Sequence, residues 1–403
     1  MRPCITPDPR RRMSEATRAT ATPPVLLGQY YRRHSTHSGY ARLADAIPEA
    51  ETVLVDQSCG CRRGDIVWRG LTWLARRGAG TRWLTLAGLR MEAAAAARMV
   101  RRRRRCVFHL LYGEAGFAWA ARWARRTGHM CVATFHAPPS LMDAILRRPQ
   151  DLSLLDGVVL VGSSQVPYFE AHVRNRDAIV VIPHGVDTDY FTPLSGPPNE
   201  GFTCLSVGTF LRDYDLLGRV ADAVADDPRI RFLIVATPES TRRLHDRPNV
   251  ICLSGLSDDD LLTCYRHADA FVLTAHDVTA NNALLEAMAC GLPIISEDVG
   301  SVRDYVRTDH AVLCRRNDAE GIVRAIRGLV ARPEARRGMA TAARCRAIEL
   351  SWPRIALRIL DMYDEIERRF DRTRGHSEPA NWAARREPVP NECLVACHAV
   401  SDQ

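Results

Sequence analysis

The sequence predicts an α/β protein of two domains, each built on a parallel sheet. The chain has 403 residues, which is long for a single core and suits two domains of about 150–200 residues each. Short apolar runs, of the kind that form buried parallel strands, alternate with helix-forming segments along both halves. Prolines and turn residues interrupt this alternation around residues 183–198, where we expect a hinge and linker.

The same pattern divides the chain into five parts. Residues 1–23 lack an apolar core and are predicted to be a disordered extension. The first domain is expected at residues 24–183 and the second at residues 184–350. A last helix over residues 351–370 precedes a mobile tail, residues 371–403, in which hydrophobic periodicity is lost.

Composition excludes several classes of protein. No run of about 18 apolar residues predicts a membrane-spanning helix, and the start, in which Met13 is an alternative first residue, does not resemble a secretory signal. Thirteen cysteines are scattered singly, which favours a reducing, cytoplasmic setting. Cys59 with Cys61, and Cys393 with Cys397, lack the second pair of ligands that a zinc site needs. We therefore expect no metal site.

Positive charge is concentrated in the first half of the chain. Residues 1–183 contain 28 arginines and 14 acidic residues, a net charge of +14, whereas residues 184–403 contain 27 arginines and 33 acidic residues, a net charge of −6. This asymmetry suggests an anionic partner for the first half: a membrane surface, an acidic acceptor or nucleic acid. The alternative explanation is a GC-rich genome, which encodes basic surface residues as arginine; the chain has no lysine.

The first strand, expected at residues 24–30, leads through a turn to a helix that begins near residue 41. Gly39 in this turn lets the backbone approach a ligand closely. Because a strand–glycine–helix sequence is common, a purely structural turn is the alternative. Further first-domain strands are expected at residues 52–55 and 83–86 and within residues 106–114, 130–139, 157–164 and 178–182.

A helix over residues 91–100 ends in five consecutive arginines, Arg101 to Arg105. Cations suit the C-terminus of a helix, although neighbouring arginines repel one another. The run could dock on anionic lipid or an acidic acceptor, or it could be a solvated turn. We expect no nucleic-acid partner, because no recognised binding motif accompanies the run.

Polar residues follow two of the first-domain strands. His136 comes directly after one strand and Glu114 shortly after another, so both are expected at the crevice where open α/β sheets bind ligands. A ring packed beneath Pro138 and Pro139 is the alternative for His136, and both a functional and a structural role stay open for Glu114. His109 lies within its strand and is predicted to be a packing residue.

One stretch of the second domain carries the strongest functional pattern. Residues 269–273 form an apolar run, small polar residues follow, and residues 283–290 favour a helix that glycine and proline close. The helix start therefore lies at the carboxyl ends of the strands, where free N–H groups and the helix dipole favour phosphate oxygens. Asn281 and Asn282 are candidate caps. Glu286, about one turn further, could accept hydrogen bonds from ribose hydroxyls or be a solvated helix residue.

The second domain opens with a strand at residues 203–207 that ends at Gly208. Arg212 follows this turn, and arginine binds phosphate bidentately. The alternative is a surface feature formed by Arg212 with Asp213. Later strands are expected at residues 232–235 and 250–253, and helices at residues 320–330 and 333–350.

Two segments resemble retaining GT-B glycosyltransferases of the large family 4 group, also described as glycosyl transferases group 1. Residues 281–293 are similar to the donor-binding motif of that family, usually Glu-x7-Glu followed by Ala-Met-Ala-Cys-Gly-x-Pro. Residues 182–191 resemble its interdomain signature, commonly Pro-Asn-Gly-Val-Asp-x3-Phe, with His184 in the usual place of Asn. The resemblance covers residues 24–370 and is weakest in the first domain.

This resemblance implies two facing Rossmann-like domains with parallel sheets and a C-terminal helix that crosses back to the first domain. Glu286 matches the second motif glutamate, which in the family holds the donor ribose. The first motif glutamate, which touches the transferred sugar, is replaced by Val278, and Asp277 or Asn281 is the candidate substitute. His136 matches the first-domain histidine that contacts the transferred sugar.

The family clamps the donor diphosphate with an arginine and a lysine, and Arg212 is the candidate here. Residues 254–257 resemble the family's base-contacting loop. The candidate catalytic residues are thus His136 and Asp277, and the candidate donor-binding residues are Gly39, Gly208, Thr209, Arg212, Gly255, Leu256, Asn281, Asn282, Ala283 and Glu286.

The implied reaction moves a sugar from a nucleotide-diphosphate donor to an acceptor, with retention of anomeric configuration. The acceptor could be lipid-linked, a saccharide or a small molecule. No cofactor is implied and no metal, because Asp187-Thr188-Asp189 has the form of a metal motif but lies in the interdomain signature. Helix-start N–H groups and Arg212 would stabilise the departing diphosphate. We expect this enzyme in the cytoplasm, with peripheral attachment to the inner face of the cell membrane as an option.

Two other functions remain open. A non-catalytic nucleotide-sugar-binding protein is suggested by Val278 and the absence of lysine. An epimerase or phosphorylase on the same fold is the third reading. A dehydrogenase or a nucleotide hydrolase is disfavoured, because the first strand is followed by no Gly-x-Gly-x-x-Gly and the chain has no Walker sequence.

Overall fold

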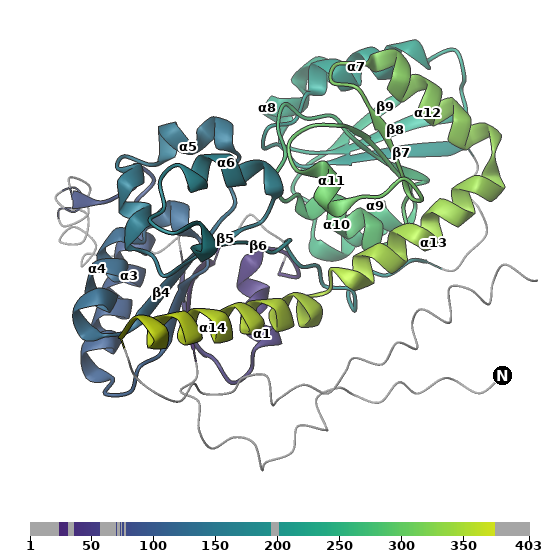
Figure 1. Ribbon diagram of the computed structural model, residues 1–403. Coiled ribbons are helices and arrows are strands. Elements are labelled where there is room, and N and C mark those ends of the chain that lie inside the picture. Colours follow the sequence, from purple (N-terminus) through teal and green to yellow (C-terminus); the bar gives the residue numbers. More distant parts are fainter. Residues whose placement is uncertain are drawn as a thin grey trace, which may run out of the picture.

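The computed structural model describes residues 24–30, 36–56, 78–194 and 201–374, together with Gly70, Trp73 and Ala75. These residues form two α/β domains that lie side by side, with the last helix beneath the first domain (Figure 1). The predicted extension, most of the predicted tail and the cysteine pairs Cys59 with Cys61 and Cys393 with Cys397 lie outside the described residues.

The first domain contains a six-stranded parallel sheet within the described residues. In spatial order its strands are β2 (Glu51–Asp56), β1 (Val25–Tyr30), β3 (Val107–Leu110), β4 (Met130–Phe135), β5 (Gly157–Leu160) and β6 (Ile179–Val181). Its helices are α1 (Leu43–Ala46), α3 (Leu86–Arg101), α4 (Ala118–Thr127), α5 (Pro139–Ile145) and α6 (Val166–Glu170). Strands β3, β4 and β5 are buried along their whole length, as expected of apolar runs covered on both faces.

The second domain repeats this architecture with another six-stranded parallel sheet. In spatial order its strands are β12 (Ala311–Cys314), β11 (Ile294–Glu297), β10 (Ala270–Leu273), β7 (Phe202–Val207), β8 (Ile230–Val235) and β9 (Val250–Leu253). Its helices are α7 (Tyr214–Ala223), α8 (Pro238–Thr241), α9 (Asp258–Arg266), α10 (Asn282–Ala289), α11 (Val302–Tyr305), α12 (Ala319–Ala331) and α13 (Pro333–Glu349). This is the strand order of a dinucleotide-binding doubly wound sheet, and it reverses between β7 and β10.

The point of reversal positions the site in each domain. In the first sheet the order reverses between β1 and β3, so the segments that follow these two strands face the crevice. In the second sheet the corresponding segments follow β7 and β10. The prediction of two Rossmann-like domains with parallel sheets is therefore confirmed.

Helix α14 (Trp352–Arg374) crosses back to the first domain, as predicted. It runs under that domain in Figure 1 and contacts α1. Tyr363 on α14 hydrogen-bonds Nδ1 of His109 at 2.6 Å, and the other ring nitrogen of His109 contacts Thr134 at 2.7 Å. The interpretation of His109 as a buried packing residue is thereby confirmed.

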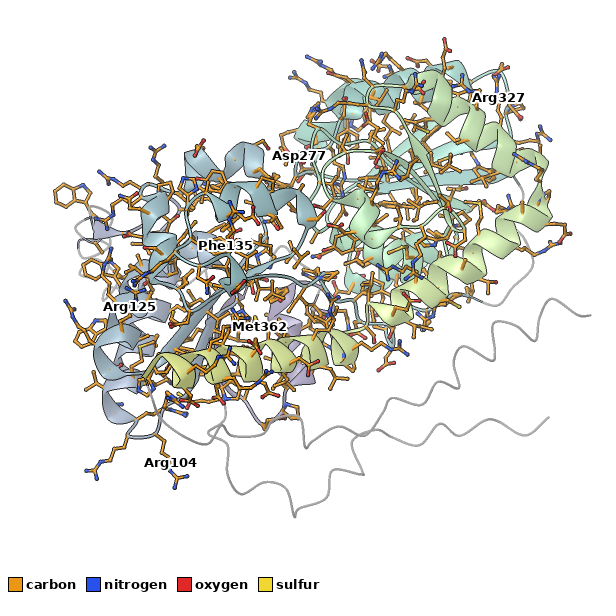
Figure 2. All side chains as sticks on the ribbon, viewed as in Figure 1. Arg104, Arg125, Phe135, Asp277, Arg327 and Met362 are labelled. Atoms are coloured by element: carbon orange, nitrogen blue, oxygen red, sulfur yellow. The ribbon has the colours of Figure 1, made fainter. Side chains whose placement is uncertain are left out.

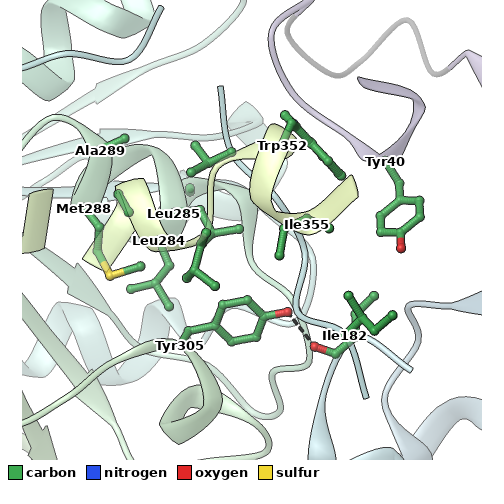
Figure 3. Packing of buried hydrophobic residues seen from close by; sticks show 14 of the residues in the cluster. Tyr40, Ile182, Leu284, Leu285, Met288, Ala289, Tyr305, Trp352 and Ile355 are labelled. Carbon is green, nitrogen blue, oxygen red and sulfur yellow. Dashed lines mark hydrogen bonds between the residues drawn. The ribbon is translucent and has the colours of Figure 1, made fainter. Parts of the chain in front are cut away.

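A continuous apolar cluster joins the two domains. It contains Tyr40 of the first domain, Tyr305 of the second and Trp352 at the start of α14 (Figure 3). The hydroxyl of Tyr305 reaches into the first domain, where it donates to the carbonyl oxygen of Val161 at 2.5 Å. His184 of the interdomain segment is buried, and its ring meets those of Tyr40 and Trp352 edge-on.

The expectation of a strand at residues 83–86 is wrong. Thr85 caps helix α3 there, with its side-chain oxygen accepting from the N–H of Gly88 at 3.1 Å. The helix consequently begins at Leu86, five residues before the predicted start. A threonine ahead of a run of good helix formers is a start signal, and it outweighs the short apolar stretch.

Candidate donor site between the two domains

A cavity of about 810 Å³ lies between the domains, at the points where both sheets reverse their strand order. Figure 2 places Asp277 at this junction. Ten of the predicted site residues line the cavity: Gly39, His136, Gly208, Thr209, Arg212, Asp277, Asn281, Asn282, Ala283 and Glu286. Gly255 and Leu256 are not among its lining residues; they follow β9, just before α9.

Arg212 is a cation held by neutral groups. Its guanidinium donates to the carbonyl oxygen of Val207 at 2.7 and 3.1 Å and to Oδ1 of Asn281 at 3.2 Å. Within the described residues it forms no ion pair with a carboxylate, and burial lowers its pKa. A guanidinium that lines a cavity without an anionic partner is a natural site for a phosphate. The alternative of an Arg212–Asp213 surface pair does not hold, because Asp213 instead caps α7.

Gly208 makes this arrangement possible. Its φ is +100°, and a Cβ built there would lie 3.1 Å from Nη2 of Arg212. Glycine is therefore favoured both by the backbone conformation and by the close approach of the guanidinium.

The start of helix α10 lies beside Arg212. Asn281 is the N-cap, and its Oδ1 accepts from the N–H of Leu284 at 3.1 Å, so one of the two predicted caps is confirmed in that role. The N–H groups of Asn282 and Ala283 make no hydrogen bond to any described residue. Two free N–H groups at a helix start, next to a guanidinium, suit a diphosphate.

Glu286 lies one turn further along α10 and is buried, so it is not a solvated helix residue. One carboxylate oxygen accepts from the hydroxyl of Tyr265 at 2.7 Å, and the other accepts from the hydroxyl of Ser38 in the first domain. Burial raises the pKa of Glu286, although both hydroxyl donors oppose this rise. Its carboxylate thus already binds two hydroxyl groups at the cavity wall.

Val278 stands where the resembled family has its first glutamate. Its side chain is buried, and its carbonyl oxygen accepts from the N–H of Ser301 at 2.7 Å. Of the two candidate substitutes, Asn281 has its side-chain oxygen occupied by two donors. Asp277 lines the cavity and has two carboxylate oxygens, which accept one hydrogen bond each, from the backbone N–H of Val278 and from the hydroxyl of Ser140, both at 2.8 Å. Asp277 is therefore the better placed acceptor.

His136 follows strand β4 and faces the cavity from the first domain. Its ring lies between those of Tyr40 and Tyr112, and neither ring nitrogen has a hydrogen-bond partner within the described residues. The ring of His136 thus contacts aromatic side chains, whereas the alternative was a ring packed beneath Pro138 and Pro139. Because Nδ1 faces the carboxylate of Glu114, Nε2 is the nitrogen left for a ligand hydroxyl.

Glu114 fixes the end of β4. One carboxylate oxygen accepts from the backbone N–H groups of His136 and Ala137, and the other lies 3.7 Å from Nδ1 of His136. Burial alone would raise the pKa of Glu114, but the His136 ring and these N–H groups outweigh it and lower the pKa. Glu114 therefore supports His136 as an ionised carboxylate.

Several residues of this site were not predicted. Tyr265 and Ser140 hold Glu286 and Asp277, and Tyr112 flanks His136. No local pattern marks them, because each acts through a residue far away in the sequence. Arg82 and Trp83, which lie just before helix α3, also line the cavity.

Two side chains of the arginine run form ion pairs within the molecule. Arg102 pairs with Glu51, and Arg105 pairs with Asp371 at 2.5 Å. Arg101, Arg103 and Arg104 are exposed, and Figure 2 shows Arg104 projecting from the first domain.

Among the described residues no group of three or more His, Cys, Asp or Glu side chains is arranged to hold a metal ion, and no helix there is both long and apolar enough to cross a membrane.

Comparison with known proteins connects this geometry to a family. The family described as "Glycosyl transferases group 1" matches residues 201–332. The D-inositol 3-phosphate glycosyltransferase of Geodermatophilus obscurus is 32% identical over 203 residues, which cover 43% of this chain and 44% of that protein. The protein of the same name from Xylanimonas cellulosilytica is 26% identical over 300 residues, covering 64% of this chain and 71% of that protein. The chain thus spans less than half the length of the first of these relatives.

Solved structures share the fold. HepE from Anabaena, in complex with UDP, superposes with a TM-score of 0.62 at 14% identity, covering 84% of this chain and 99% of that one. The sucrose-phosphate synthase of Thermosynechococcus elongatus also gives a TM-score of 0.62, at 16% identity, covering 86% and 99%. These likenesses confirm the predicted GT-B arrangement of two facing domains.

Proposed function

Residues 201–332 match the glycosyl transferases group 1 family, and we propose that the chain is a glycosyltransferase that uses a nucleotide-diphosphate sugar. It transfers the sugar with retention of configuration, without a metal, to an acceptor bound on the first-domain side of the cavity. The reaction takes place in the cytoplasm. The single observation that carries this proposal is Arg212, a cavity-lining guanidinium that has no carboxylate partner among the described residues and lies next to the start of α10.

The donor diphosphate binds between Arg212 and the start of α10. As the bond between the anomeric carbon and the diphosphate oxygen breaks, negative charge grows on the leaving diphosphate. The guanidinium and the N–H groups of Asn282 and Ala283 stabilise that charge with donors that are already oriented. Because these groups belong to the chain itself, the departure of the diphosphate needs no added cation.

The nucleoside extends from the diphosphate toward Glu286. A ribose hydroxyl takes the place of the Ser38 hydroxyl on the carboxylate of Glu286, while Tyr265 keeps the other oxygen in position. Gly255 and Leu256, although they lie outside the cavity lining, are proposed to reach the base, as the resembled family suggests. Gly39 permits the first-domain turn to approach the donor; its φ is +91°.

The transferred sugar lies between His136 and Asp277. His136 offers Nε2, which has no hydrogen-bond partner within the described residues, to a sugar hydroxyl, and Asp277 offers a carboxylate in place of the missing motif glutamate. Hydrogen bonds across the cavity, such as that from Ser140 to Asp277, hold the domains together and limit access of water.

Calorimetry with nucleoside diphosphates tests the donor site, starting with UDP because the similar HepE structure contains it. We expect UDP or another nucleoside diphosphate to bind, and the corresponding nucleotide sugar to be hydrolysed slowly without an acceptor. Absence of binding by every common nucleoside diphosphate would reject the proposal.

A non-catalytic nucleotide-sugar-binding protein is the second candidate, and Val278 is the observation that favours it. If nucleotide sugars bind but are neither hydrolysed nor transferred to any acceptor in cell extracts, this candidate replaces the first.

A further inference from the structure

The outer face of helix α4 alternates tryptophan with arginine. Trp119, Arg122, Trp123 and Arg126 follow the i, i+3, i+4, i+7 spacing of a single helix face. Both tryptophans are exposed, although this side chain is ordinarily well buried. The buried residues of the helix are all alanines, so the large side chains are on the solvent side.

Gly78, which precedes α3, adjoins this face. The ring of Trp119 lies against Gly78, where an added Cβ would come within 2.6 Å of it. In the sequence, Trp73 and Trp83 come before and after Gly78, and 60% and 46% of their surface is exposed. We call these four tryptophans together with Arg122, Arg125 and Arg126 the Trp–Arg surface.

This part of the chain is strongly basic on its outside. Residues 78–130 contain eleven arginines and only two acidic residues, Glu92 and Glu114, both of which are buried. The acidic partner of Arg122, Asp151, is also buried. The exposed charge that residues 78–130 contribute is therefore positive, and Figure 2 shows Arg125 and Arg104 at the outer edge of the first domain.

We propose that the Trp–Arg surface docks on an anionic lipid bilayer. Exposed tryptophans with arginines are the side chains that settle at the headgroup level, and anionic headgroups supply the complementary charge. Single-stranded nucleic acid fits less well, since it needs free ring faces for stacking. Here Arg122 lies over the ring of Trp119 at 5.4 Å and Arg126 over that of Trp123 at 5.8 Å.

The surface also reaches the cavity. Trp83 belongs to it and, with Arg82, lines the first-domain side of the cavity. Resting on the proposed function, docking places the acceptor side of the cavity near the headgroups, which suits an acceptor anchored in the membrane.

Vesicle flotation of the full chain tests the docking. We expect the protein to float with vesicles of phosphatidylcholine and phosphatidylglycerol but not with phosphatidylcholine alone. The variant R125Q/R126Q is expected to bind about fivefold more weakly for each arginine removed. Its matched control is R324Q/R327Q, which removes two exposed arginines from α12 of the second domain and is expected to bind as the parent does.

Tryptophan fluorescence tests the contact itself. Vesicles with brominated acyl chains are expected to quench the tryptophan fluorescence of the parent, and the quenching is expected to fall in W119F/W123F, which keeps an aromatic ring at both positions. Failure of the parent to float, equal binding by R125Q/R126Q and its control, or unchanged quenching in W119F/W123F overturns the proposal. Binding of an RNA oligonucleotide instead of vesicles overturns it as well. None of these measurements uses a nucleotide donor, so their failure leaves the proposed function untouched.

Discussion

The hydroxyl of Ser38, in the first domain, donates a hydrogen bond to Oε1 of Glu286, in the second domain. Tyr265 donates to the other carboxylate oxygen at 2.7 Å. A buried carboxylate is costly unless hydrogen-bonded donors surround it, and here hydroxyl groups fill that role. Since ribose also presents hydroxyl groups, the Ser38 hydroxyl occupies a position that a bound nucleoside can take.

Glu286→Ala is expected to weaken UDP binding by about 10- to 100-fold, because a hydrogen bond to a charged group contributes roughly 1.5–3 kcal/mol. Binding of inorganic diphosphate, which has no ribose, should not change. Calorimetry with both ligands measures the difference. Ser38→Ala is the matched control: it removes the same interdomain hydrogen bond but leaves the carboxylate, so UDP should bind at least as tightly as to the parent. Equal losses for UDP and diphosphate in Glu286→Ala would show that Glu286 does not hold the ribose.

Arg212→Met is expected to weaken both UDP and inorganic diphosphate by about 10- to 100-fold, since it removes the cation that faces the phosphates. Arg212→Lys should give an intermediate loss, because an ammonium keeps the charge without the two-pronged geometry. The control Arg243→Met removes an exposed arginine that pairs with Asp215 on the surface. If Arg212→Met binds diphosphate like this control, the phosphates lie elsewhere.

Much of the donor side was predictable because its signals are local. The apolar run of β10, the asparagine cap and the helix formers of α10 are consecutive in sequence, so they predict a helix start at a strand end without tertiary information. The roles of Ser38 and Tyr265 were not predictable, since each depends on a hydrogen bond to Glu286, 248 and 21 residues away.

The prediction for residues 83–86 failed for a physical reason. A short apolar stretch is compatible with both a strand and a helix, and the cap formed by Thr85 favours the helix. The sequence suggests a membrane surface from the charge asymmetry of the two halves and from the arginine run. The folded chain uses Arg102 and Arg105 for internal ion pairs and exposes the tryptophans of α4 instead.

His136→Ala is expected to lower the rate of sugar transfer or donor hydrolysis by about 100-fold, because a poorly positioned sugar loses the reactive geometry. Its UDP affinity should stay at the parent value, since His136 faces the sugar and not the nucleotide. Steady-state rates and calorimetry separate the two effects. His172→Ala, a first-domain histidine outside the cavity, is the control. A loss of UDP affinity equal to the loss of rate would place His136 at the nucleotide.

Glu114→Gln is expected to destabilise the protein in a pH-dependent way. The folded pKa of Glu114 is lowered, so its carboxylate contributes stability above the unfolded value, about 4.3, and this is lost as the pH falls through the folded value. The difference in unfolding free energy between parent and variant should therefore be largest near neutral pH and shrink below about pH 4.3. Urea unfolding over a pH series measures it. The exposed Glu320→Gln should show no such difference, and a gap that grows toward acid would contradict the assignment.

Gly185→Ala is expected to lower the free energy of unfolding by about 1–3 kcal/mol, the usual cost of an overpacked core. A Cβ at Gly185 would lie 2.5 Å from the ring of Trp352. The ring has little room to move, because it packs against His184 and Tyr40, and the backbone N–H of Trp352 donates to the carbonyl oxygen of Val186.

The matched control for this substitution is Gly338→Ala in α13. No atom lies within 4 Å of a Cβ added there, so the variant should gain about 0.5–1 kcal/mol, as expected for alanine in place of glycine inside a helix. Chemical denaturation should show opposite changes in the free energy of unfolding for the two variants if the contact between Gly185 and Trp352 fixes the interdomain segment against the start of α14. A Gly185→Ala protein as stable as the parent would mean that the interdomain segment and the start of α14 can separate without a cost in free energy. This contact would then not hold the domains in the arrangement that closes the cavity.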